Sequence, residues 1–311
     1  MTESPATPRV LFAVEGSIAR ITLDNPDRKG AITLEMAAQI GECCDRVEQD
    51  ESIGAVVVAS VGPYFCSGAD TRDLAVSSAA PASSEAVARV SAVYGAFVRI
   101  GNLPVPTVSA VVGGAVGAGL NLALATDVML VTPDAVLDSG FLARRIHPGG
   151  GHLALLGRAV GRQQALAMGV LGAALSGTDA VRRGLAWDTA EPDEILAEAE
   201  ALVAIAARDP LLARRIKNSA RLELDQPGVP WSAAVEIERG VQMWSMGRKG
   251  EAAWTPSRAS RSFRATRDEW WHRPTGRHPR TGLHHDVLGA VLHTAARRDG
   301  GGRHQGRGAG G

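Results

Sequence analysis

The sequence has 311 residues, 45% of them hydrophobic and 21% charged, which is typical of a globular protein in water. Its 33 basic and 33 acidic side chains cancel, but residues 249–311 carry 12 basic and 5 acidic side chains, so residues 1–248 are net acidic. An acidic body argues against general nucleic-acid binding, which needs a basic face. No apolar run reaches the ~18–20 residues that cross a membrane, and the start MTESPATPRV lacks the apolar core of a secretory signal.

The N-terminal hundred residues alternate β-rich and helical patterns. In chain order they predict a hairpin at 10–23, a helix at 33–47, a buried strand at 53–59 and a helix at 85–100. Thr33 is placed to cap the first of these helices. The small, polar residues 75–84 (AVSSAAPASS) predict a mobile loop.

The same alternation continues through the remainder of the ordered part. It predicts strands at 104–112, 127–131 and 185–188, and helices at 120–125, 153–161, 162–170, 178–183, 193–207, 210–224 and 231–246. Buried strands that alternate with helices indicate an α/β fold with crossover connections.

The composition changes near residue 249. The remainder holds six of the eight histidines and three of the six tryptophans, and it ends in the low-complexity run RRDGGGRHQGRGAGG. This mixture resembles GC-rich DNA translated in an unintended frame, and it lacks the periodicity of a packed core. A natural disordered tail and a nucleic-acid-binding arm are the alternatives for 249–311.

Three cysteines, Cys43, Cys44 and Cys66, are too few for a disulfide framework and lack metal-ligand spacing. The sequence therefore predicts no metal site and no redox cofactor. A reducing, cytoplasmic location is the simplest expectation.

Four glycine-containing segments follow one another with characteristic spacing. YFCSGAD at 64–70 is similar to F-[CS]-[AS]-G-A-D, and VVGGAVGAGLNLALATD at 111–127 is similar to N-G-x-x-x-G-G-G-x-E-L-x-x-x-x-D. NPDRKGAIT near the N-terminus and HPGGG at 147–151 complete the set. Over roughly residues 10–246 the chain resembles the crotonase (enoyl-CoA hydratase/isomerase) superfamily.

The resemblance implies a crotonase-like spiral of ββα turns over residues 1–190, which would hold an acyl-CoA site. A helical region at 191–248 would follow and serve trimerisation, so a homotrimer or hexamer is expected. Five residues of the last predicted helix are candidates for that interface: Val235, Ile237, Val241, Met243 and Trp244.

A thioester oxygen gains negative charge when its α-carbon is deprotonated, and two converging N–H groups can stabilise the resulting enolate. The resemblance implies that these donors are the backbone N–H groups of Ala69 and Ala118. It also implies that coenzyme A, as part of the substrate, contacts Arg28, Arg72, Ala69 and Asp70. The alternative for the two arginines is an ordinary surface role.

The family's hydratases use two glutamates, and the resemblance puts those positions at Asn121 and Phe141. Neither residue exchanges protons, so ordinary hydration is in doubt. Asn121 could still orient a water or a substrate oxygen, and Phe141 would make the pocket apolar. Five neighbouring side chains are candidate substitutes: Asp138, Ser139, His147, His152 and Tyr94. A loop cap is the alternative for Asp138, and a turn-stabilising hydrogen bond or a helix cap for each histidine.

Three functional interpretations stay open. The first is a catalytic acyl-CoA enzyme with relocated acid–base groups. The second is a non-catalytic acyl-CoA-binding protein that retains the fold. The third is a scaffold or assembly subunit without affinity for coenzyme A.

Overall fold

A six-stranded sheet organises the computed structural model, which describes residues 7–224 and 230–251. Its strands lie in the order β1-β2-β3-β4-β6-β9, and β5-β7-β8 form a smaller sheet. The strands are β1 (Arg9–Glu15), β2 (Ile18–Asp24), β3 (Ala55–Ser60), β4 (Thr107–Val111), β5 (Gly114–Val116), β6 (Val128–Val131), β7 (Val136–Asp138), β8 (Leu175–Ser176) and β9 (Asp188–Thr189). The predictions for residues 252–311 fall outside the described ranges.

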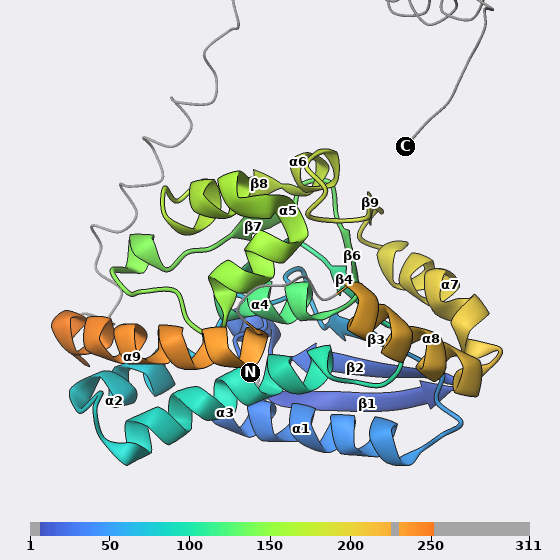
Figure 1. Ribbon diagram of the computed structural model, residues 1–311, viewed down its shortest axis with the longest axis horizontal. Coiled ribbons are helices and arrows are strands. Elements are labelled where there is room, and N and C mark those ends of the chain that lie inside the picture. Colours follow the sequence, from blue (N-terminus) through green and yellow to red (C-terminus); the bar gives the residue numbers. More distant parts are fainter. Residues whose placement is uncertain (1–6, 225–229, 252–311) are drawn as a thin grey trace, which may run out of the picture. The chain divides into compact units, whose positions relative to one another are not determined.

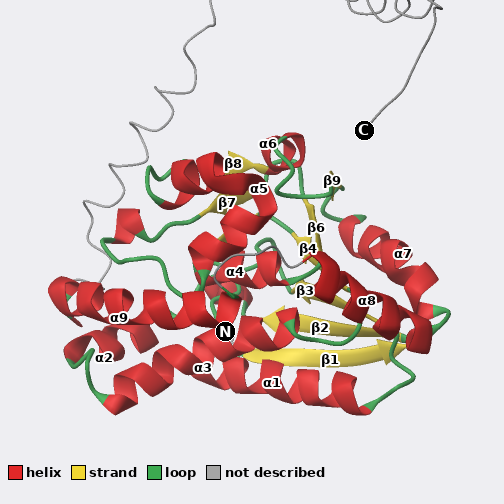
Figure 2. Cartoon of the chain, viewed as in Figure 1, coloured by secondary structure: helices red, strands yellow, loops and turns green. Residues whose placement is uncertain are grey.

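Helices follow most of the strands, as the alternating pattern predicts (Figures 1 and 2). They are α1 (Leu34–Gln49), α2 (Thr71–Ala79), α3 (Ser84–Gly101), α4 (Ala118–Ala125), α5 (His152–Gly169), α6 (Gly177–Arg182), α7 (Ile195–Ala207), α8 (Pro210–Leu224) and α9 (Trp231–Lys249). Only β1 and β2 are antiparallel in the large sheet, and its other pairs are parallel. The predicted α/β class with crossovers is confirmed.

The two faces of the large sheet are buried by different helices. Along β3, Val56 and Val58 join the core that contains α1 and α3 side chains, whereas Ala55, Val57 and Ala59 pack with Ile195, Ala199 and Val203 of α7. A strand that is apolar on both faces reads as a continuous hydrophobic run, which is why residues 53–59 are recognisable from the sequence.

The prediction of a mobile loop at 75–84 is wrong for residues 75–79. Helix α2 continues to Ala79, and the chain leaves helical structure only at residues 80–83. Ser77 and Ser78 are buried, and their hydroxyl groups donate to the carbonyl groups of Asp73 and Leu74 one turn earlier. Serines bonded in this way remain in a helix, which the polar composition alone does not reveal.

Helix α9 closes the structure over α2, α3 and the glycine-rich turn before α5. The Trp231 indole donates to the Gly150 carbonyl at 3.0 Å, and the His147 N–H donates to the Ser245 hydroxyl at 2.9 Å. Of the predicted interface side chains described here, Val235 and Met243 are buried, while Val241 and Trp244 are 42% and 59% exposed. Trimerisation through this helix stays a prediction.

Candidate active site

The segment from Phe65 to Asp70 lies between two backbones that it bonds on opposite sides. The N–H of Ile32 donates to Gly68 O, and the N–H of Asp70 donates to Ile32 O, both at 2.9 Å. On the other side, Cys66 forms a parallel bridge with Ala115. Because backbone groups alternate along an extended chain, the N–H of Ala69, which lies opposite Ile32, points away from Ile32.

Helix α4 begins beside this segment. Gly117 holds a left-handed φ of 59° before the helix, and the first N–H groups of a helix have no partner within it. A Cβ placed on Gly68 would lie 3.0 Å from Val116 O and 3.7 Å from the Ala118 nitrogen. Gly68 also has a φ of 110°, which favours glycine, and this brings the backbone of Gly68-Ala69 against the start of α4.

A second glycine tightens the same contact. A Cβ on Gly119 would lie 2.2 Å from Cys66 O. Among the described residues, the N–H groups of Ala69 and Ala118 donate to no backbone carbonyl in the turns and loops. Two N–H donors therefore sit at adjoining edges of two closely packed segments.

Asp70 joins the two arginines predicted to contact coenzyme A. Its carboxylate caps α2 by accepting from the Arg72 N–H at 2.8 Å. It forms an ion pair with Arg28, and Arg72 Nε lies 3.5 Å from its second oxygen. Arg72 is 69% exposed and Arg28 is 34% exposed, so both guanidinium groups are accessible from solvent beside the Ala69 segment.

A chain of hydrogen bonds runs through the core from Gly149 to Ser139. The Asn121 amide nitrogen donates to Gly149 O at 2.9 Å, and its oxygen lies 2.7 Å from His152 Nδ1. The other ring nitrogen, Nε2, lies 2.5 Å from Ser139 Oγ. Asn121, His152 and Ser139 are at most 2% exposed. Burial lowers the pKa of His152 to about 3, so the imidazole is neutral at physiological pH.

Phe141 adds an aromatic wall to these groups. Its ring meets the His152 ring edge-on, with centroids 4.9 Å apart. The tip of the Phe141 ring lies 3.8 Å from a Cβ placed on Gly117, directly before Ala118. The start of α4 therefore faces an apolar side chain rather than a carboxylate.

Comparisons with known proteins identify the family of the chain. The family model for enoyl-CoA hydratase/isomerase matches residues 13–242. The chain belongs to the enoyl-CoA hydratase/isomerase family. The predicted resemblance to the crotonase superfamily is thereby confirmed.

Relatives and solved structures of this family cover most of the chain. A probable enoyl-CoA hydratase, EchA14 of Mycobacterium tuberculosis, is 36% identical over 252 residues, which are 81% of this chain and 95% of the relative. The 1,2-epoxyphenylacetyl-CoA isomerase of Escherichia coli is 34% identical over 190 residues, 61% of this chain and 72% of that protein. A crystal structure of an enoyl-CoA hydratase from Bacillus halodurans superposes with a TM-score of 0.68 at 22% identity, covering 79% of this chain and 98% of the other, and shows the shared crotonase fold.

Three of the candidate acid–base groups in this family member are engaged in local or interhelical bonds. The Asp138 carboxylate accepts from the Gly140 N–H at 3.0 Å, as in a loop cap. His147 Nδ1 lies 2.6 Å from Pro148 O. The Tyr94 hydroxyl bonds to Gln242 of α9, and burial raises the pKa of this tyrosine. The structure thus groups Ser139 and His152 with Asn121 in one chain of hydrogen bonds, whereas the bonds just given for Asp138, His147 and Tyr94 go to other partners.

Glu238 is a residue of the site region that the sequence analysis missed. From α9 it accepts hydrogen bonds from the backbone N–H groups of Gly151, His152 and Leu153 at 2.8–3.2 Å. It therefore caps the positive end of the α5 dipole. Burial raises the pKa of Glu238. The sequence signal that could have identified Glu238 is its spacing from Val235 and Gln242, which are buried on the same face of α9.

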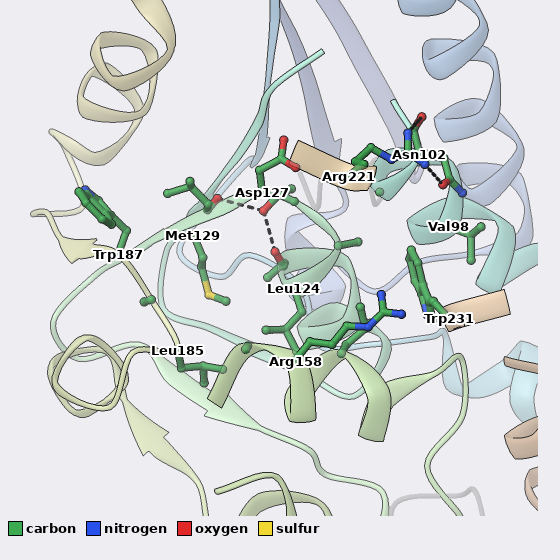
Figure 3. Close-up of a pocket in the computed structure, with 18 of the residues that line it drawn as sticks. Val98, Asn102, Leu124, Asp127, Met129, Arg158, Leu185, Trp187, Arg221 and Trp231 are labelled. Atoms are coloured by element: carbon green, nitrogen blue, oxygen red, sulfur yellow. Dashed lines mark hydrogen bonds between the residues drawn. The ribbon is translucent and has the colours of Figure 1, made fainter. Parts of the chain in front are cut away.

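A separate groove of about 980 Å³ lies at the other end of α4 (Figure 3). Its lining includes Asn102, Asp127, Arg158, Trp187, Arg221 and Trp231. None of the sequence-predicted site residues lines it, so it is distinct from the region around Ala69 and Ala118.

No cluster of three or more His, Cys, Asp or Glu side chains suited to a metal ion occurs in the part of the chain that the structure describes. The three cysteines are free and buried, and desolvation raises the pKa of Cys66 to about 12. A thiol of that kind is a poor nucleophile. No helix among the described residues is long and apolar enough to span a membrane.

Proposed function

We propose that the chain binds an acyl-CoA and polarises its thioester oxygen between the backbone N–H groups of Ala69 and Ala118. The observation that carries the proposal is the close packing of Gly68-Ala69 against the start of α4, with both donors outside the backbone hydrogen bonds of the described turns. Each donor of such a pair contributes about 2.7–4 kcal/mol to a transition state that carries an oxyanion. The N-terminal dipole of α4 acts in the same direction.

The neutral surroundings favour isomerase- or lyase-type chemistry on the enolate over the addition of water. Asn121 and Phe141 supply no carboxylate to activate a water, and burial keeps the His152 imidazole uncharged. The apolar ring of Phe141 suits a flat acyl group. A relative at 34% identity is named 1,2-epoxyphenylacetyl-CoA isomerase, which supports an aromatic acyl group.

The same observations favour a second candidate, a protein that binds acyl-CoA without turning it over. In either case Arg28 and Arg72, which share Asp70, are suited to the phosphates of coenzyme A. A trimeric or hexameric assembly belongs to the proposal and is supported by the exposed Val241 and Trp244 on α9.

The test is Ala118→Pro, which removes one N–H at the first position of a helix, where proline is tolerated. The infrared carbonyl band of butanoyl-CoA, ¹³C-labelled at the thioester carbon, should shift to lower frequency in the wild-type complex and shift less in the variant. Ser84→Pro, at the exposed first position of α3, is the matched control and should retain the full shift.

An unshifted carbonyl band in the wild-type complex, or no binding of butanoyl-CoA, contradicts the proposal. Turnover of crotonyl-CoA or exchange of α-protons with D₂O separates the two candidates, because only the catalytic one produces either.

A further inference from the structure

We infer that Ser139 and His152 are positioning residues that lock the Asn121 amide in one orientation, so that it offers the acyl group a hydrogen-bond donor and no acceptor. The preferred ligand is then an acyl-CoA whose β-carbon carries an oxygen that only accepts, as in a 3-oxoacyl group. This inference rests on the proposed acyl-CoA site and adds the substrate class.

The direction of every bond in the chain follows from one carbonyl group. Gly149 O can only accept, so the Asn121 nitrogen faces it and the Asn121 oxygen faces His152. That oxygen also only accepts, so His152 carries its proton on Nδ1. Nε2 is then an acceptor, and the Ser139 hydroxyl donates to it.

The Asn121 oxygen is therefore committed to His152, while one N–H of the amide is left over. Within the described ranges, no protein group accepts this second N–H, although Asn121 is 1% exposed. A buried donor without a partner is costly, which points to a ligand that supplies the acceptor.

The position of Asn121 specifies which atom of the ligand it meets. Asn121 is the fourth residue of α4, on the same face as Ala118 and about 4.5 Å further along the axis. A thioester oxygen held at Ala118 puts the β-carbon, rather than the α-carbon or the chain end, beside Asn121. The proton of a 3-hydroxyl group would find no acceptor there, because Phe141 offers none and the Asn121 oxygen already accepts from His152.

Serine, histidine and asparagine also form hydrolytic triads, but the environment here disfavours that role. A triad histidine must accept the serine proton during attack. The His152 ring is 0% exposed, and Glu238, the carboxylate on the neighbouring helix, accepts from three backbone N–H groups. Ser139 thus donates to Nε2 and holds the His152 ring in place.

The experiment measures dissociation constants of 3-oxobutanoyl-CoA, 3-hydroxybutanoyl-CoA and butanoyl-CoA by calorimetry, at a mildly acidic pH where the ketone form dominates. The wild type should bind the 3-oxo ester about fivefold or more tightly than the 3-hydroxy ester. Asn121→Asp removes the spare N–H in nearly the same volume and should abolish this preference.

Ser139→Ala leaves the buried Nε2 of His152 without a donor, which loosens the ring that holds the Asn121 oxygen and should bring the preference towards one. Ser139→Thr keeps the hydroxyl and should restore the preference. Ser109→Ala is the matched control, because Ser109 is buried and bonds at the opposite end of α4. Thermal melts verify that each variant is folded.

An equal or tighter affinity of the wild type for the 3-hydroxy ester overturns the inference. So does an unchanged preference in Asn121→Asp or in Ser139→Ala, or a covalent acyl adduct on Ser139 in the mass spectrum. Failure to bind any of the three esters instead contradicts the proposed acyl-CoA site itself.

Discussion

The neutral state of His152 has a measurable consequence for stability, which His152→Gln tests. The substitution keeps a polar side chain between Asn121 and Ser139 but removes the titrating ring. Burial lowers the pKa of His152 from 6.5 to about 3, so between these values the unfolded chain holds a proton that the folded chain lacks. Stability therefore falls as the pH falls through this interval. At pH 5 the loss is about 2 kcal/mol, taking about 1.36 kcal/mol per pH unit below 6.5.

Urea unfolding followed by circular dichroism at pH 7.5 and pH 5.0 gives the free energy of unfolding for both proteins. The wild type should lose about 2 kcal/mol more than His152→Gln between the two conditions. Glu238, whose pKa is raised, is present in both proteins, so its opposite contribution cancels.

Ser139→Ala is the control for this experiment, because it removes a polar partner and leaves the ring. It should retain the wild-type dependence on pH even though it is less stable at both values. If wild type and His152→Gln lose the same free energy between pH 7.5 and pH 5.0, the buried, neutral histidine is refuted.

Two further substitutions test the packing around α4. Gly119→Ala puts a methyl group 2.2 Å from Cys66 O and should lower the free energy of unfolding in urea by about 3 kcal/mol. The control Gly41→Ala, which has open space in α1, should be neutral or slightly stabilising. Similar effects at both sites would contradict the close contact at Gly119. Lys217→Met removes a buried ammonium that donates to Val105 O and to Asp127, each at 2.8 Å, and should cost about 1–3 kcal/mol. The exposed Arg215→Met is its control, and an equal loss in both would rule out the buried bonds as the cause.

The parts of the site that depend on backbone approach are predictable from the sequence. Gly68, Gly117 and Gly119 each occupy a place where a Cβ would be strained or would meet another backbone, so their spacing marks the packed segments directly. The same holds for Thr33, whose hydroxyl accepts from the Met36 N–H as the capping pattern indicates.

The polar chain behind that site is not predictable in the same way. Ser139 and His152 are 13 residues apart, and Asn121 lies 31 residues before His152. Their contact depends on how β7, α4 and α5 meet, and no local periodicity encodes it. Glu238, 86 residues after His152, arrives from α9 and leaves even less of a local signal.

Asn121 and Phe141 are physically linked through His152, which contacts both of them. A carboxylate at position 121 would lie within hydrogen-bond distance of Nδ1, and one at position 141 would lie against the ring face or edge. Either negative charge would raise the pKa of the buried imidazole and favour its protonated form. A protonated ring would donate from both nitrogens, so Ser139 would have to accept instead of donate. An uncharged His152 is therefore compatible with a neutral amide at Asn121 and an apolar ring at Phe141. The groups that surround His152 are thus neutral or apolar on every side that these two residues supply.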